Sequence, residues 1–207
     1  MDAYLIIGTN CDLSKFNFTN SFVVGIDKGA LIATQNKIKL DLAVGDFDSI
    51  SKEELSLIEA RKIIHLNPIK DETDTLYALR LCKDYEKIYL LGGIQGARIE
   101  HFVTNLCLFA EFPNLIIIDD NSMIRLCSYE EDFHKDEYQY HSFFALEDVM
   151  GLSLKGFKYE LNNYNLKMFN PLGVSNEITN NAHLSYQSGK LLMIKTKKEE
   201  VLWKEKI

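Results

Sequence analysis

Residues 42–49 read Leu-Ala-Val-Gly-Asp-Phe-Asp-Ser, a short apolar run that ends in a glycine and two carboxylates. An uninterrupted apolar run bounded by a turn is typical of a strand buried on both faces of a parallel sheet. Residues i and i+2 of an extended chain point the same way, so we expect Asp46 and Asp48 to reach one ion. The segment therefore predicts a strand with an acidic site at its carboxyl end, where open α/β sheets bind their ligands.

The same stretch also has a purely structural interpretation. Asp48 and Ser49 can accept hydrogen bonds from backbone N–H groups in an Asx-turn ahead of the next helix. Ser51 and Glu54 have the spacing of a capping box and predict that helix. Taken alone, the segment leaves both interpretations open.

Similar apolar runs recur on both sides of this segment and alternate with amphipathic stretches up to about residue 118. Helices are expected after Ser51, over residues 73–82 and over residues 99–110. Because crossover connections place helices between parallel strands, residues 1–120 are expected to form an α/β domain with a mostly parallel, Rossmann-like sheet. The expected strands are residues 4–7, 22–26, 42–44, 63–66, 88–91 and 115–118.

The pattern changes after residue 121 to short alternating segments rich in Tyr, Phe and Leu. Turn residues such as Gly151, Pro171 and Gly189 separate them. Alternation with a period of two is typical of antiparallel strands with one buried face. Residues 121–207 are therefore expected to form an all-β sandwich or barrel domain.

Composition excludes several classes of function. The net charge is -7 and Lys and Arg are not concentrated anywhere, which argues against a nucleic-acid partner. The run Lys195, Lys197 and Lys198 is followed at once by two glutamates and is interpreted as a solvated turn. No apolar stretch approaches the roughly 18 residues that span a bilayer, and the start lacks a signal peptide's basic region. We expect a cytoplasmic protein that binds no membrane.

The four cysteines lie apart and form no Cys-x-x-Cys pair. Cys82 and Cys107 fall on the apolar faces of predicted helices. In a reducing compartment such a pattern predicts buried free thiols rather than disulfides or a zinc site. The cysteines are Cys11, Cys82, Cys107 and Cys127.

A second acidic segment, Lys70-Asp71-Glu72-Thr73-Asp74, precedes an apolar helical pattern. Asp71 and Asp74 are three residues apart, a spacing that shares one helix face, and Lys70 adds a cation that attracts phosphate. Acidic residues in a first helical turn are also favoured by the macrodipole and by free backbone amides. Ligand binding and helix capping both remain open for this segment.

A third segment, residues 91–101, reads Leu-Gly-Gly-Ile-Gln-Gly-Ala-Arg-Ile-Glu-His. Its glycines let backbone amides approach a phosphate, and Arg98 can bind phosphate oxygens in a bidentate way. It matches neither the Walker lysine pattern nor the full dinucleotide fingerprint, and His101 alone is more typical of a structural hydrogen bond. All three segments follow predicted strands, however, and should meet at one edge of the sheet, which independent helix capping does not require.

Together these segments resemble the hallmarks of the thiamin pyrophosphokinase (thiamin diphosphokinase) family. Those hallmarks are an Asp-Gly-Gly turn, Gly-Asp-Phe-Asp-Ser, an Asp-x-Thr-Asp helix start and a glycine-rich turn with Arg. They occur in the same order at residues 27–29, 45–49, 71–74 and 93–101. Looser matches at residues 156–161 and 174–177 are similar to the family's thiamin-binding β domain.

The resemblance implies transfer of pyrophosphate from ATP to the hydroxyl of thiamin, giving thiamin diphosphate and AMP. Mg²⁺ is the implied cofactor, and the implied assembly is a homodimer with active sites at the subunit interface. Residues 1–120 would form the catalytic, nucleotide- and magnesium-binding domain, and residues 121–207 the thiamin-binding domain.

The resemblance also implies roles for individual residues. The implied metal ligands are Asp46, Asp48, Asp71 and Asp74. The implied catalytic residues are Asp46, Asp71, Asp74 and Arg98. The implied nucleotide contacts are Asp27, Gly29, Ser49, Lys70, Thr73, Gly93, Gly96, Arg98 and His101. Ser175 and Asn176 would lie near thiamin, and the general base stays unassigned.

Three positions depart from the family pattern: Lys28 and Ala97 replace glycines, and Glu100 replaces an aspartate. Lys28 puts the close backbone approach at its turn in doubt. Two rival hypotheses therefore stand beside the first. One is a pyrophosphokinase for another hydroxymethyl heterocycle such as a pterin, and the other is a sensor that binds thiamin or magnesium nucleotide without catalysis.

Overall fold

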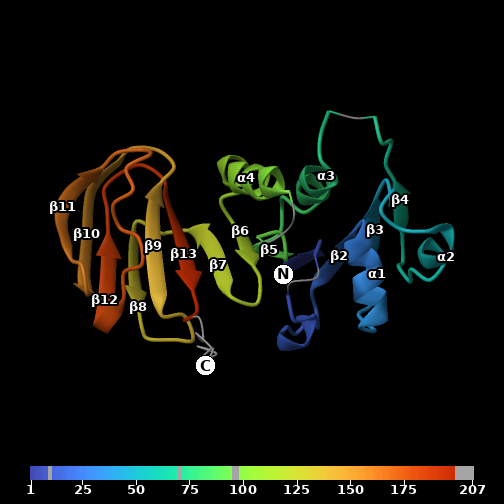
Figure 1. The fold of residues 1–207 in the computed structure, drawn as a ribbon, viewed down its shortest axis with the longest axis horizontal. Coiled ribbons are helices and arrows are strands. Elements are labelled where there is room, and N and C mark those ends of the chain that lie inside the picture. Colours follow the sequence, from blue (N-terminus) through green and yellow to red (C-terminus); the bar gives the residue numbers. More distant parts are fainter. Residues whose placement is uncertain (9–10, 70, 95–97, 199–207) are drawn as a thin grey trace, which may run out of the picture. The chain divides into compact units, whose positions relative to one another are not determined.

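The computed structural model describes residues 1–8, 11–69, 71–94 and 98–198. The chain divides into two compact units, Met1–Asp120 and Asn121–Ile207 (Figure 1). The first unit combines parallel strands with helices, and the second consists of antiparallel strands. The predicted fold, an α/β domain followed by an all-β domain, is confirmed.

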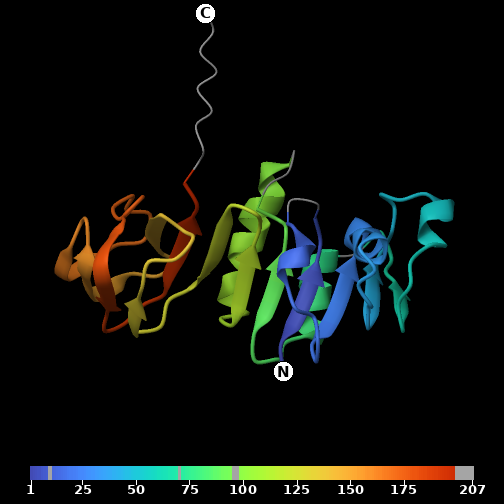
Figure 2. The same cartoon turned by 90° about the horizontal axis from the view of Figure 1, so that it is seen from below.

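The first unit is built on a parallel sheet in the order β4-β3-β2-β1-β5-β6. Its strands lie side by side in both views (Figures 1 and 2). Each lies within one residue of the range predicted from its apolar run. The strands are β1 (Ala3–Ile6), β2 (Phe22–Ile26), β3 (Leu42–Gly45), β4 (Ile63–His65), β5 (Ile88–Leu91) and β6 (Leu115–Ile118).

Helices occupy the connections of this sheet. Ser51 caps its helix with both hydrogen bonds of a capping box to Glu54, as its spacing predicted. The α-helices are α1 (Lys28–Gln35), α2 (Lys52–Leu55), α3 (Asp74–Leu81) and α4 (Ile99–Cys107). Of these, α2, α3 and α4 lie in the amphipathic stretches that predicted them, whereas no range was predicted for α1. Two short 3₁₀ helices are η1 (Leu13–Lys15) and η2 (Leu108–Ala110).

The order of the strands reverses at β1. From β1 the chain builds outward through β2, β3 and β4, and it then returns to place β5 on the opposite side of β1. Connections on the two sides of such a switch point diverge, and this leaves a crevice outside the carboxyl ends of the two central strands. The fold thus provides a ligand site at the ends of β1 and β5.

The second unit is a sandwich of two antiparallel layers. Strands β7 (Ser122–Leu126) and β9 (Tyr140–Ala145) flank β13 (Leu191–Thr196) in one layer. In the other, the order is β11 (Leu161–Leu166), β10 (Val149–Phe157), β12 (Ile178–Ser185), β8 (Glu130–Phe133). One hydrophobic core holds residues of both layers together, including Phe143, Met193, Leu152, Leu154 and Phe157.

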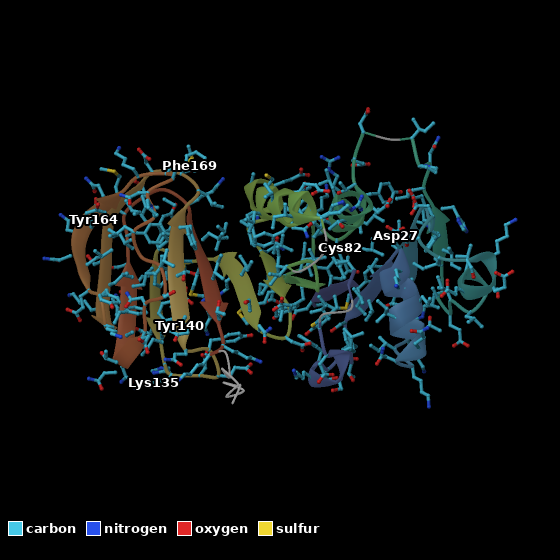
Figure 3. All side chains as sticks on the ribbon, in the orientation of Figure 1. Asp27, Cys82, Lys135, Tyr140, Tyr164 and Phe169 are labelled. Atoms are coloured by element: carbon cyan, nitrogen blue, oxygen red, sulfur yellow. The ribbon has the colours of Figure 1, made fainter. Side chains whose placement is uncertain are left out.

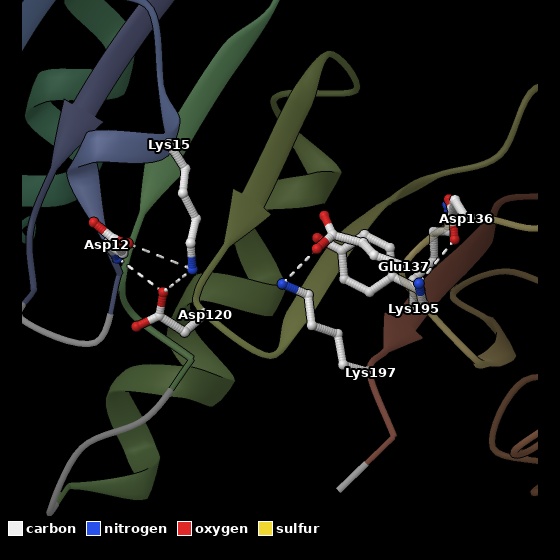
Figure 4. Close-up of polar contacts among 8 residues, drawn as sticks. Asp12, Lys15, Asp120, Asp136, Glu137, Lys195 and Lys197 are labelled. Atoms are coloured by element: carbon white, nitrogen blue, oxygen red, sulfur yellow. Dashed lines mark hydrogen bonds and ion pairs between the residues drawn. The ribbon is translucent and has the colours of Figure 1, made fainter. Parts of the chain in front are cut away.

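Two lysines of the predicted solvated turn are instead held against the sandwich. Lys195 lies on β13 with only 11% of its side chain exposed, contacts Asp136, and lies 5.0 Å from the Tyr138 ring centroid. Lys197 pairs with Glu137 at 2.7 Å and lies 5.6 Å from the same ring (Figure 4). That interpretation is wrong because the acids and the ring come from the distant β8–β9 connection.

The cysteine prediction is confirmed for all but one thiol. Every cysteine is free, and Cys11, Cys82 and Cys127 are buried. Cys107 is exposed, so its predicted burial is wrong. Cys107 lies on the same face of α4 as Ile99 and Val103, since the three residues are spaced by four, and these two are 69% and 53% exposed. This face is exposed because α4 packs with its opposite face. No helix in the described part of the chain is long and apolar enough to cross a membrane.

Candidate active site

Three carboxylates meet at the carboxyl edge of the parallel sheet. Asp27 follows β2, Asp46 follows β3, and Asp74 is the first residue of α3, which follows β4. Each offers an oxygen within 4.8 Å of the other two, and all three side chains are half-buried. Adjacent parallel strands end at one edge, and this topology gathers residues that lie up to 47 positions apart in the chain.

The backbone around Asp27 leaves room for its carboxylate. Asp27 itself has a φ of 47° and lies where β2 turns into α1 (Figure 3). The Phe47 N–H donates to Asp27 Oδ1 at 3.3 Å. A Cβ added to Gly45 would lie 1.9 Å from the same oxygen, so only glycine at position 45 allows this arrangement.

The cluster is electrostatically unfavourable for the protein alone. Burial, together with the charges of Asp74 and Asp46, raises the pKa of Asp27 to about 7. A hydrogen bond between the carboxyl groups of Asp27 and Asp74 acts in the same direction. Carboxylates this close repel when all are ionised, and a bound cation relieves that repulsion. Three carboxylate oxygens this close together suit a hard divalent cation such as Mg²⁺.

The structure does not bring the other two predicted metal ligands into this cluster. Asp48 is exposed, and its N–H donates to Asp46 Oδ1 at 3.1 Å, so the acceptor of this Asx-turn is Asp46 and not Asp48 or Ser49 as the structural alternative had it. Phe47 has a φ of 57°, so the chain bends there and the extended-chain argument for Asp46 and Asp48 fails. Asp71 is also exposed, and it lies before α3, so the argument from a shared helix face fails as well.

A cavity of about 290 Å³ lies at the switch point of the sheet. Gly93, Arg98 and His101, which the glycine-rich segment predicted as nucleotide contacts, all line it. Thr75, the neighbour of Asp74 in α3, lines it too, so the cavity reaches the first turn of the helix that begins at Asp74. The remaining lining residues are Ile7, Gly8, Ile94, Ile99, Phe102 and Asn105.

Two other predicted nucleotide contacts, Gly29 and Thr73, have structural roles. Gly29 is buried, and a Cβ there would lie 1.9 Å from the Ile6 carbonyl oxygen, so close packing of α1 on β1 requires this glycine. Thr73 caps α3 by accepting from the Leu76 N–H at 3.1 Å. Ser49 is exposed and does not line the cavity. Lys70 and Gly96 lie outside the described residues.

In the second unit, Asn176, one of the two predicted thiamin contacts, lines a mostly apolar pocket of about 310 Å³, and Ser175 is not among the lining residues. Asn176 is 1% exposed, and its amide is engaged with the backbone of Tyr159. It accepts from the Tyr159 N–H at 2.9 Å and donates to the Tyr159 carbonyl at 2.7 Å. Ser175 is exposed, with a φ of 55°. The pocket is lined by Leu154, Tyr159, Leu161, Pro171, Leu172, Gly173, Val174 and Asn176.

Sequence reasoning missed two features of these sites. Asp27 was expected at the nucleotide phosphates and not as a member of the carboxylate cluster, although it follows a strand adjacent to β3 in the sheet. Asn105 was not singled out, although it lies four residues after His101 and therefore on the same face of α4. Strand order and helix spacing are the signals that point to these residues.

Comparisons with known proteins identify the family of this chain. The model of the thiamin pyrophosphokinase catalytic domain matches residues 13–118, and that of the family's vitamin B1 binding domain matches residues 129–191. The chain belongs to the thiamin pyrophosphokinase family. The family resemblance of the sequence motifs is thereby confirmed, and with it the assignment to ATP-dependent pyrophosphotransferases.

Relatives of known structure support the family assignment along nearly the whole chain. The thiamine pyrophosphokinase of Bacillus subtilis is 33% identical over 196 residues, which cover 89% of this chain and 92% of the relative. A crystal structure of the Bacillus subtilis thiamine pyrophosphokinase superposes with a TM-score of 0.85 at 30% identity, covering 96% and 99% of the two chains. A thiamin pyrophosphokinase family protein from Enterococcus faecalis gives a TM-score of 0.82 at 27% identity, covering 96% and 100%.

Proposed function

We propose that this protein transfers the pyrophosphoryl group of ATP to the hydroxyl of thiamin, yielding thiamin diphosphate and AMP. One observation carries the proposal: the carboxylates of Asp27, Asp46 and Asp74 lie within 4.8 Å of one another. A cavity lined by Gly93 and Arg98 is also lined by Thr75, the residue after Asp74. A divalent cation beside a triphosphate needs oxygen ligands on one side and phosphate donors on the other, and this edge of the sheet offers both.

The carboxylate cluster is proposed as the site of Mg²⁺. Asp27, Asp46 and Asp74 would supply its protein oxygens, and the bound ion would neutralise charge on the phosphoryl oxygens. Mg²⁺ keeps several waters, so the exposed Asp48 and Asp71 would act through water if they take part. Asp27, first expected at the phosphates, fits better as a ligand because a carboxylate repels phosphate directly.

The cavity is proposed as the site of the nucleotide phosphates. Arg98 occupies the N-cap position of α4 and makes no side-chain capping hydrogen bond. The His101 N–H donates to the Arg98 carbonyl at 3.1 Å, so the N–H groups of Ile99 and Glu100 are the ones proposed to meet an anion. The Arg98 guanidinium would bind phosphate oxygens, with the backbone of Gly93 and the side chain of His101 beside it. Lys70, Gly96, Ser49 and Thr73 remain proposed contacts on the strength of the family resemblance.

Transfer requires the thiamin hydroxyl to attack the β-phosphorus of ATP. The bond from that phosphorus to the oxygen shared with the α-phosphorus breaks, and the oxygen leaves on AMP. The chain's residues act by positioning the phosphates in line and by stabilising charge on them, chiefly through Arg98 and the amides at the start of α4. A carboxylate at this edge would accept the hydroxyl proton, and the general base stays unassigned.

Thiamin is proposed to bind the second unit at the pocket beside Tyr159. The family resemblance extends this to a homodimer with active sites at the subunit interface. Apolar side chains on the β11–β12 connection support an interface there: Phe169 is 91% and Met168 47% exposed (Figure 3). We also propose a cytoplasmic location, which the free thiols favour.

Purified protein incubated with ATP, Mg²⁺ and thiamin tests the proposal directly. We expect AMP and thiamin diphosphate in equal amounts. ADP as the nucleotide product would contradict pyrophosphoryl transfer. Faster turnover with a hydroxymethylpterin would favour the rival heterocycle, and binding of thiamin without AMP release would favour the sensor.

A further inference from the structure

Asn105 is a buried polar side chain in α4 that reaches the glycine turn after β5. It is 5% exposed, and its Nδ2 donates to the Gly93 carbonyl oxygen at 2.9 Å. It also lines the cavity proposed for the nucleotide. The hydrogen bond joins residues twelve positions apart, so it ties the helix to the turn and not to its own backbone.

The turn that Asn105 contacts has an unusual backbone. Gly92 and Gly93 both have positive φ values, 89° and 86°. The Gly92 N–H is held by the Ile118 carbonyl of β6 at 2.8 Å, which fixes the start of the turn. Consecutive glycines can adopt many other conformations, so the end of the turn needs a second restraint to stay in this one. The Asn105 amide supplies it.

The hydrogen bond also sets the direction of a backbone donor. The N–H of a trans peptide points away from its C=O, so a fixed Gly93 carbonyl fixes the Ile94 N–H on the opposite side of the peptide plane. Only glycine fits at this position, since a Cβ at Gly93 would lie 2.6 Å from Ile7 Cδ1 and 2.9 Å from Asn105 Nδ2. Amides oriented in advance bind an anion without a further ordering cost.

We propose that Asn105 is a positioning residue for the nucleotide, holding the Gly92–Gly93 turn in the conformation whose amides receive phosphate. This inference rests on the proposed function, because it takes the cavity as the phosphate site. Asn105 itself need not touch the substrate. Without its amide the turn would populate other conformations, and the apparent affinity for nucleotide falls with the competent fraction.

The test compares three variants in equilibrium binding of Mg²⁺ with a non-hydrolysable ATP analogue. Asn105→Ala removes the donor and is expected to weaken nucleotide binding about tenfold, the size of one lost buried hydrogen bond. Thr104→Ala is the matched control on the same helix, since it removes a hydrogen bond from Thr104 to the Glu100 carbonyl that does not involve the turn. The control is expected to bind like the unaltered protein, and thiamin affinity should be unchanged in both.

Asn105→Asp separates positioning from simple packing. It keeps the shape of the side chain, but an ionised carboxylate cannot donate to the Gly93 carbonyl, whereas a protonated one can. Nucleotide affinity relative to the unaltered protein should therefore recover as the pH falls from 8 to 6, because burial raises a carboxyl pKa. The nucleotide affinity of Asn105→Ala relative to the unaltered protein should not change over the same pH range.

The outcomes are distinguishable. Unchanged nucleotide affinity in Asn105→Ala, or equal weakening for nucleotide and thiamin, would overturn the positioning role. The positioning role would also be overturned if the relative nucleotide affinity of Asn105→Asp depended on pH no more than that of Asn105→Ala. Should Asn105→Asp fail to fold, Asn105→Ser, whose donor is too short to reach Gly93, is expected to match Asn105→Ala. Failure of the proposed function appears separately, as absence of AMP from the unaltered protein that still binds nucleotide.

Discussion

The two units of the chain treat their partly buried charges in opposite ways. At the sheet edge of the first unit, Asp27, Asp46 and Asp74 bring like charges together, and the pKa of Asp27 rises to about 7. In the second unit the charges are paired: Arg125 contacts Glu131, and Lys195 contacts Asp136. The contrast separates a structural role of charge pairs from a ligand-binding role of like charges, because an arrangement that costs stability is retained where a ligand needs it.

The largest expected effect is on turnover at the carboxylate cluster. Asp46→Ala or Asp74→Ala should lower the rate of AMP formation at saturating Mg²⁺ and substrates by about a thousandfold or more, since each removes an oxygen from the proposed ion. Both positions lie at element ends, so circular dichroism should show an intact fold. Asp48→Ala is the control, because Asp48 is exposed and lies outside the cluster. Near-normal turnover in either cluster variant would contradict the metal site.

The sign of a stability change offers a sharper test of the comparison. Glu131→Gln leaves Arg125 without its carboxylate and should lower the free energy of unfolding by about 2 kcal/mol. Asp27→Asn removes a repelling charge and should raise it by about 1 kcal/mol at pH 8 in magnesium-free buffer. Each kcal/mol corresponds to about 2–4 °C in melting temperature for a protein of this size. If both substitutions changed the free energy of unfolding in the same direction, the distinction between the units would be contradicted.

A pH dependence of stability is expected from the second unit. His141 is fully buried beside Phe133 and Phe157, and burial together with the nearby charge of Lys195 lowers its pKa to about 4. The unfolded chain therefore binds one more proton than the folded one between about pH 6.5 and 4, so stability falls as the pH drops through that range. Asp27, whose pKa is raised to about 7, acts in the opposite direction over the same range. The contribution of His141 is therefore measured by comparing melting curves at pH 7 and pH 5 with those of a variant without this histidine.

His141→Phe serves as the comparison for that experiment. The ring keeps much of the shape and joins the neighbouring aromatic side chains, but it cannot titrate. Its melting temperature should fall less between pH 7 and pH 5 than that of the unaltered protein. An equal decrease in the two proteins would assign the acid sensitivity to other groups.

The smallest effect is expected at the capping box of α2. Ser51→Ala removes the hydrogen bond to the Glu54 N–H and should cost about 1 kcal/mol of stability. AMP formation should not change, since Ser51 lies outside both the cluster and the cavity. A loss of turnover larger than the loss of stability explains would extend the functional region of the first unit beyond its sheet edge.

The sequence predicted the strands of the first unit within one residue because buried parallel strands are marked by uninterrupted apolar runs. The same strands carried the acids and the glycine turn to one edge, and the topology alone explains why they meet. The sequence pattern did not predict the local direction of the backbone. Asp48 lies outside the cluster, and the positive φ of Phe47 breaks the extended chain on which its prediction depended. Asp71 lies before α3, which begins only at Asp74, so it does not share a helix face with Asp74.

Other errors came from partners that are distant in the chain. Lys195 is held by Asp136, 59 residues away, and no pattern near the lysines indicates this. Asn105 depends on Gly93 in the same way, through a contact that requires α4 to pack on the turn. Cys107 is exposed because α4 buries its other face. Periodicity shows that a helix has an apolar stripe but not what covers it.

One measurement tests the central claim most directly: titration of the protein with Mn²⁺ in place of Mg²⁺, in the presence of a non-hydrolysable ATP analogue and followed by electron paramagnetic resonance. We predict tight protein-dependent binding of the ion that is lost in Asp27→Asn, Asp46→Asn and Asp74→Asn alike. Ion binding that all three variants retain at the affinity of the unaltered protein would contradict the account.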